Sequence, residues 1–111
     1  MSQKYMLPSI ERESVNGVQQ ISLITDLFTN RKILLFGEID EVMVYSFTMQ
    51  IMSLMEDENS KIDIFINSPG GEVNSGLAIY DLIQSCKVPI NMYCIGMAAS
   101  MGAVIFASGK K

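Results

Sequence analysis

Short apolar runs alternate along this chain with stretches in which apolar side chains recur every three or four positions. Three nearly continuous apolar runs predict buried strands, at residues 32–36, 62–66 and 90–95. Three stretches with helical spacing predict helices, at residues 40–56, 72–86 and from 98 or 99 to about 107. Strand and helix therefore alternate three times. This order predicts an α/β fold of repeated β-α units, with a parallel sheet and flanking helices.

The segment before the first predicted strand lacks this regularity. Residues 1–20 mix proline, serine and charged side chains, and we interpret them as a mobile arm with a strand pair around Asn16-Gly17. Residues 26–31 match the end of a short helix. We therefore divide the chain into an arm over residues 1–20 and an α/β domain over residues 21–111.

Composition narrows the possible partners. Hydrophobic residues make up 49% of the chain and the formal net charge is −4, which argues against nucleic acid or an anionic membrane as a partner. The apolar runs are too short to span a bilayer, and no export signal is recognisable, so we expect a cytoplasmic protein. Cys86 and Cys94 fit no metal spacing and are expected to be buried free thiols. No metal or other cofactor is predicted.

Candidate chemistry lies at the ends of two neighbouring predicted strands. Ser100 stands where a strand turns into a helix among small residues, and Gly70-Gly71 makes a similar junction one unit earlier. A hydroxyl near a helix start and a glycine pair that aims an N–H at an oxyanion form half of an acyl-transfer site. Locally, a helix cap at Ser100 and a structural turn at Gly70-Gly71 explain the same residues. The sequence contains no histidine, and Lys110 is poorly placed as a substitute base.

Three motifs resemble the Clp-type serine peptidase family, the proteolytic subunits of ATP-dependent Clp proteases. They stand in the family's order and spacing: Ile66-Asn67-Ser68-Pro69-Gly70-Gly71, Gly76-Leu77-Ala78-Ile79-Tyr80-Asp81 and Gly96-Met97-Ala98-Ala99-Ser100-Met101-Gly102-Ala103. The resemblance covers the whole chain but only about the N-terminal half of a family member. It implies the Clp protease/crotonase type of α/β fold, with residues 21–111 as the N-terminal part of the head domain.

The resemblance also implies roles for single residues. Ser100 is similar to the nucleophile of a serine endopeptidase, and the N–H groups of Gly71 and Met101 to its oxyanion hole. The segment Gly70, Gly71, Glu72 and Val73 would bind the substrate backbone. Residues 1–20 are similar to the axial loops of the ring. Family members form homo-oligomers, stacked heptameric rings that make a tetradecamer, and degrade unfolded polypeptides delivered by an AAA+ unfoldase.

This chain also departs from the family pattern. The triad histidine and aspartate and the handle region lie beyond the position of Lys111, so we expect the chain alone to be inactive, with an exposed sheet edge and apolar face. Asp63 stands where the family usually carries an aromatic residue of the unfoldase-docking pocket. Two alternatives stay open, a catalytically incomplete ring subunit or interaction protein of the same family and a crotonase-like acyl-CoA enzyme.

Overall fold

The computed structural model describes residues 9–14 and 17–109, which form two compact units, residues 1–30 and residues 31–111. In the first unit, β1 (Ser9–Ser14) pairs antiparallel with β2 (Gly17–Ser22), and α1 (Leu23–Thr29) follows. The predicted strand pair is therefore confirmed, although its turn at residues 15–16 and the start of the arm lie outside the described residues. The helix ends close to the predicted position.

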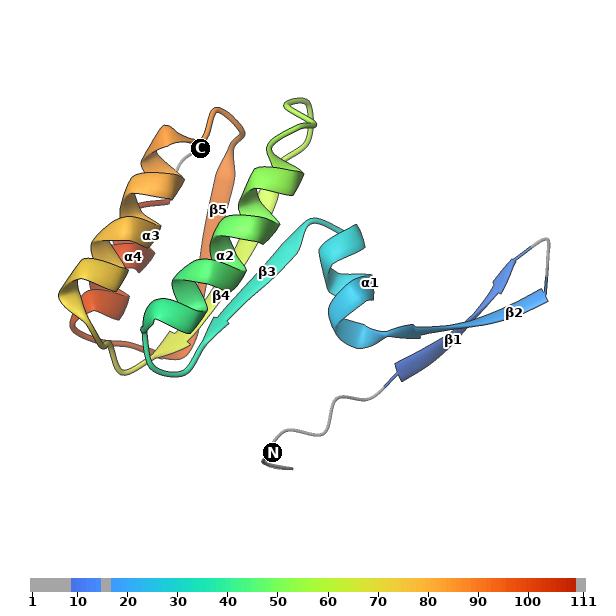
Figure 1. Ribbon diagram of the computed structural model, residues 1–111, viewed down its shortest axis with the longest axis horizontal. Helices are drawn as coiled ribbons and strands as arrows, with labels where there is room; N and C mark the ends of the chain where they lie inside the picture. The colour runs from blue at the N-terminus through green and yellow to red at the C-terminus, as the bar shows by residue number, and fades with distance from the viewer. Residues whose placement is uncertain (1–8, 15–16, 110–111) are drawn as a thin grey trace. The chain divides into compact units, whose positions relative to one another are not determined.

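The second unit contains the repeated β-α pattern (Figure 1). Its elements are β3 (Lys32–Phe36), α2 (Glu41–Leu54), β4 (Ile62–Ser68), α3 (Val73–Ser85), β5 (Ile90–Ala98) and α4 (Met101–Ala107). The three strands are parallel and lie in the order β3-β4-β5. The predicted α/β class, with a parallel sheet and flanking helices, is confirmed.

One face of the sheet carries the hydrophobic core. In β4 every second side chain is buried, from Ile62 through Ile64 and Ile66 to Ser68. The helices contribute buried side chains to the same core, among them Phe47, Ile51, Ile79, Ile83 and Ile105. Helices α2, α3 and α4 lie side by side along the sheet (Figure 1). A strand buried on one face with period two is the pattern that fixes register, because a slip of one residue would expose the whole apolar row.

The opposite face of the sheet is largely apolar and open. Leu34 and Phe36 are 41% and 48% exposed, and Tyr93 stacks on Phe65 with ring centroids 4.9 Å apart. On the same face Asp63 is half-buried and accepts a hydrogen bond from Asn91, 3.2 Å away. Both β3 and β5 are edge strands of this sheet. An exposed apolar face and edge, as expected from the sequence, are surfaces that proteins normally cover.

The predicted boundaries are wrong at the end of β5. This strand continues to Ala98 rather than ending at residue 95, and α4 begins at Met101 rather than at residue 98 or 99. The reason is that Ala98 still pairs with Ser68 after an irregularity in the ladder, so the backbone stays extended. The expected burial of Cys94 is also wrong: it is exposed on this edge strand, whereas Cys86 is buried. In the part of the chain that is described, no helix is long and apolar enough to cross a membrane.

Asp40 is the N-cap of α2, and its carboxylate accepts a hydrogen bond of 2.9 Å from the N–H of Met43. Replacing Asp40 with alanine should lower the free energy of unfolding by about 0.5–2 kcal/mol, because this N–H then lacks its partner. Asparagine retains the acceptor, so Asp40→Asn should cost clearly less. Urea unfolding of both variants measures the difference, and equal losses would contradict the capping role.

Candidate active site

The carboxyl ends of the three parallel strands lie at one end of the sheet, and the turns that follow them meet there (Figure 1). The contact between the glycine turn after β4 and the serine turn after β5 is close. A methyl group added at Gly70 would lie 2.8 Å from Cβ of Ser100, 2.9 Å from the carbonyl oxygen of Ala99 and 3.4 Å from the backbone nitrogen of Met101. The predicted convergence of the two motifs is therefore confirmed.

Ser100 occupies a strained backbone conformation, with φ 55° and ψ −123°. Such a conformation costs a non-glycine residue about 1–3 kcal/mol and persists only where the surroundings impose it. Here the N–H of Ala99 donates to the carbonyl of Ser68 at 3.0 Å, and that of Ala103 donates to the carbonyl of Ser100 at 3.0 Å. The exposed Ser100 hydroxyl makes no capping bond to α4. Helix capping by the side chain therefore does not explain this serine.

The backbone of Gly71 is oriented by Ile39, which is fully buried in the loop after β3. The N–H of Ile39 donates to the carbonyl of Gly70, and its carbonyl accepts from the N–H of Glu72, both at 2.9 Å. Because each trans peptide holds its C=O and N–H in opposite directions, both the N–H and the C=O of Gly71 point away from Ile39. Gly71 thus presents a strand-like edge on the side that Ile39 does not occupy.

Gly71 also lies too close to Ile39 for any side chain. A methyl group added there would lie 2.2 Å from the carbonyl oxygen of Ile39 and 2.7 Å from its backbone nitrogen. Only glycine permits this approach. Glycine is therefore required at positions 70 and 71 for two different reasons. Gly70 makes room for the Ser100 turn and has a φ of 108°, whereas Gly71 lets the strand pair with Ile39.

Met101 is the first residue of α4, and its side chain anchors the helix start. A methyl group added at Gly76 in α3 would lie 2.5 Å from Cε of Met101, which shows how tightly α4 packs on α3 at this point. The N–H groups of a helix's first turn have no partner within the helix. The following N–H, that of Gly102, donates to Ala99 at 2.8 Å, whereas the N–H of Met101 donates to no backbone carbonyl of the described residues.

The other predicted substrate-binding residues, Glu72 and Val73, begin α3. The N–H of Glu72 is bonded to Ile39, and its carboxylate accepts a hydrogen bond of 2.7 Å from the Ser75 hydroxyl. Val73 is 59% exposed. The structure thus brings Gly70, Ser100 and Met101 into one cluster, with Gly71 next in the chain, and leaves Glu72 occupied by its own helix start. Substrate binding by these residues stays a prediction.

Two residues of this cluster were not identified from the sequence as part of a site. Ile39 lies in a loop whose pairing with Gly71 depends on backbone geometry, so the sequence carries no signal for it. Ser68 is fully buried at the end of β4 and touches both turns. The sequence signal for Ser68 was the alternation in β4, which places this polar residue on the same face of the strand as three buried isoleucines.

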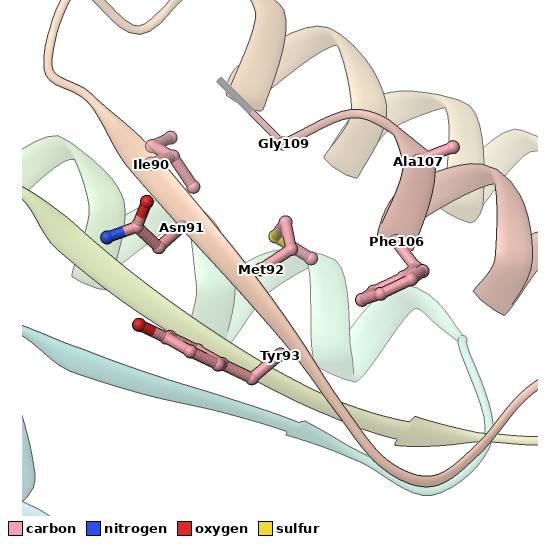
Figure 2. Close-up of a pocket in the computed structure, with 7 residues that line it drawn as sticks. All are labelled: Ile90, Asn91, Met92, Tyr93, Phe106, Ala107 and Gly109. Carbon is pink, nitrogen blue, oxygen red and sulfur yellow. The ribbon is translucent and has the colours of Figure 1, made fainter. Parts of the chain in front are cut away.

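Two pockets lined by described residues lie away from this cluster. One of about 340 Å³ separates residues 90–93 of β5 from Phe106, Ala107 and Gly109 at the end of α4 (Figure 2). Another of about 470 Å³ lies between α2 and α3, where Tyr45, Met49 and Ala78 contribute to its walls. Neither is lined by Ser100, Gly71 or Met101. Over residues 9–14 and 17–109, no three Cys, Asp or Glu side chains gather to hold a metal ion.

Comparison with known proteins identifies relatives of this chain. The family model described as Clp protease matches residues 15–111. A relative from Carsonella ruddii (strain PV), named ATP-dependent Clp protease proteolytic subunit, is 41% identical over 105 residues. The alignment covers 95% of this chain and 54% of the relative, so the chain spans about half the length of the curated relative it matches.

Gly70 and Gly37 form a matched pair for testing the contact between the two turns. Both have positive φ, 108° and 97°, but a methyl group at Gly37 would meet nothing within 4 Å. Gly37→Ala should lower the free energy of unfolding by about 1–2 kcal/mol, which is the conformational cost of a positive φ alone. Gly70→Ala should lower the free energy of unfolding by a further ~1–3 kcal/mol, because the added methyl group clashes with Ser100 and Ala99. Urea unfolding compares them, and similar losses would mean that the turns are not in contact.

Proposed function

The chain belongs to the Clp protease family, and we propose that it carries the nucleophile and oxyanion hole of a Clp-type serine endopeptidase. In this proposal Ser100 attacks the peptide carbonyl, and the N–H groups of Gly71 and Met101 bind the resulting oxyanion. The segment from Gly70 to Val73 lies alongside the substrate backbone. The family membership favours a peptidase over a crotonase-like acyl-CoA enzyme.

The observation that carries this proposal is the packing of Gly70 against Ser100, together with the orientation of Gly71. Ser100 is exposed, and its hydroxyl makes no capping bond. It packs against Gly70, and the next N–H in the chain, that of Gly71, is turned away from Ile39. A nucleophile next to an N–H directed by the backbone is what acyl transfer requires, because negative charge develops on the carbonyl oxygen as the nucleophile attacks. Edge pairing at Gly71 would hold an extended substrate across Ser100.

The reaction then proceeds in two balanced stages. Oγ of Ser100 bonds to the carbonyl carbon while a general base takes the hydroxyl proton, giving a tetrahedral oxyanion. Collapse of this oxyanion breaks the C–N bond, and the amine leaves with the proton returned by the base. Water then attacks the acyl ester by the same route, releasing the carboxylic acid and restoring the serine.

In this proposal the general base is a histidine from outside these 111 residues, which contain none. An unassisted serine hydroxyl is a weak nucleophile at neutral pH. In the Clp family the triad histidine and aspartate follow the region that this chain matches. Residues 1–111 therefore supply the nucleophile and the proposed donors, and a further part of the polypeptide, or a neighbouring subunit, supplies the base.

We further propose that the protein works in the cytoplasm as a homo-oligomer of stacked heptameric rings, which receives unfolded polypeptide from an AAA+ unfoldase. The open apolar face with Leu34, Phe36 and Tyr93 supports burial in an assembly, because an apolar surface of this kind is normally covered. The arm over residues 1–20 would form the axial loops. Asp63, on the same open face, weakens the expectation of a docking pocket of the usual aromatic kind.

The absence of histidine also favours one alternative, a catalytically incomplete subunit that joins active relatives in a ring. Such a subunit would keep the fold and the Ser100 turn but would lack an activated hydroxyl. It would co-purify with a longer relative, and neither hydrolysis nor reaction with a fluorophosphonate would depend on its Ser100.

Ser100→Ala in the complete polypeptide encoded by the gene should lower the kcat of peptide hydrolysis by at least about 10⁴-fold, as removal of a serine nucleophile does. A fluorophosphonate should form an adduct on the wild-type protein, with fluoride as the leaving group, at the peptide that contains Ser100. Ser85→Ala is the matched control, since Ser85 is exposed and its hydroxyl donates to the carbonyl of Leu82 in its own helix. Hydrolysis that survives Ser100→Ala would refute the proposed nucleophile.

A further inference from the structure

Ser68 is a polar residue where the pattern of β4 calls for an apolar one. The strand buries Ile62, Ile64 and Ile66 on one face, and Ser68 continues this row with none of its surface exposed. A buried hydroxyl lowers stability unless it is hydrogen-bonded. Its partners therefore indicate why serine occupies this position.

The partners of Ser68 belong to both turns of the candidate site. Its Oγ accepts a hydrogen bond of 3.1 Å from the N–H of Gly70, which closes a turn around Pro69. Its carbonyl accepts the N–H of Ala99 at 3.0 Å, directly before Ser100. A methyl group added at Gly102 would lie 3.1 Å from the same carbonyl oxygen. One residue thus ties the glycine turn to the serine turn.

The side-chain bond matters because a glycine with a φ of 108° has no preference of its own for this conformation. Glycine populates both signs of φ, so the peptide between Gly70 and Gly71 has no intrinsic orientation. Two hydrogen bonds hold the peptides on either side of Gly70. The bond from the N–H of Gly70 to Ser68 fixes the Pro69–Gly70 peptide, and the bond from Ile39 to the carbonyl of Gly70 fixes the Gly70–Gly71 peptide. Since the carbonyl of Gly70 and the N–H of Gly71 belong to one planar peptide, the Ile39 bond sets the direction of the N–H, and the Ser68 bond supports it by fixing the peptide that precedes Gly70.

We propose that Ser68 is a positioning residue, which holds the Gly70–Gly71 peptide so that the N–H of Gly71 meets the carbonyl oxygen of a substrate at Ser100. This inference rests on the proposed peptidase function. Without the Ser68 acceptor, the buried N–H of Gly70 lacks its partner, the Pro69–Gly70 peptide rotates, and the Gly70–Gly71 peptide is held by the Ile39 bond alone. The donor at Gly71 then moves away from the developing charge, while the Ser100 turn keeps its bond to the Ser68 carbonyl.

Three substitutions at Ser68 separate orientation from packing in the complete polypeptide. Alanine removes the acceptor and some volume, cysteine keeps the volume but is a weak acceptor, and threonine keeps the hydroxyl. We expect kcat for a fluorogenic peptide to fall about 10- to 100-fold in Ser68→Ala and Ser68→Cys, with little change in KM. Ser68→Thr should restore most of kcat. The rate of fluorophosphonate labelling at Ser100 should follow kcat.

Ser108→Ala is the matched control. Ser108 is also a buried serine, 2% exposed, and its hydroxyl donates to a backbone carbonyl, that of Ile105, at the opposite end of α4. Ser108→Ala should lower the melting temperature without changing kcat. Recovery of wild-type kcat in Ser68→Cys would show that only volume matters and would overturn the positioning role, as would wild-type kcat in a folded Ser68→Ala. Loss of activity in Ser100→Ala is measured in parallel, so failure of the peptidase assignment itself is recognised separately.

Discussion

The two backbone hydrogen bonds of Ile39 are the constraint on which the candidate site depends. They engage the carbonyl of Gly70 and the N–H of Glu72, and the planarity of the intervening peptides leaves both polar groups of Gly71 directed to the other side. The approach is close enough to exclude any side chain at Gly71. A donor that is aimed in this way needs no reorganisation when charge develops, which is the property that makes backbone oxyanion holes effective.

This constraint works because the sheet beneath it is asymmetric. The buried row of β4 packs under three helices and fixes the register with β3 and β5, so the turns after these strands meet at one end. The opposite face, with Leu34, Phe36 and Tyr93, contributes little to this core and stays exposed. The packed face thus positions the two turns of the candidate site, whereas the opposite face stays open.

Much of this architecture follows from the sequence. Continuous apolar runs identified β3 and β4, helical spacing identified α2, and small residues at two strand ends located the Ser100 and Gly70 turns. The remainder depends on contacts between distant segments. Period and composition do not reveal that β5 stays extended to Ala98, since this depends on its pairing with Ser68. The role of Ile39 is equally hidden, because any residue supplies the same backbone N–H and carbonyl.

The geometry also distinguishes the two halves of the proposed serine peptidase site, which are the backbone donors and the general base. The position of Ser100 and the direction of the Gly71 N–H are set within residues 31–111, by backbone hydrogen bonds together with the side chain of Ser68. A general base is a side chain with its own pKa, and no histidine is present to provide one. Oxyanion stabilisation operates with or without that base and by itself accelerates acyl transfer. An active subunit and an incomplete one would therefore share this local structure, and they would differ in the reactivity of the Ser100 hydroxyl rather than in the donors around it.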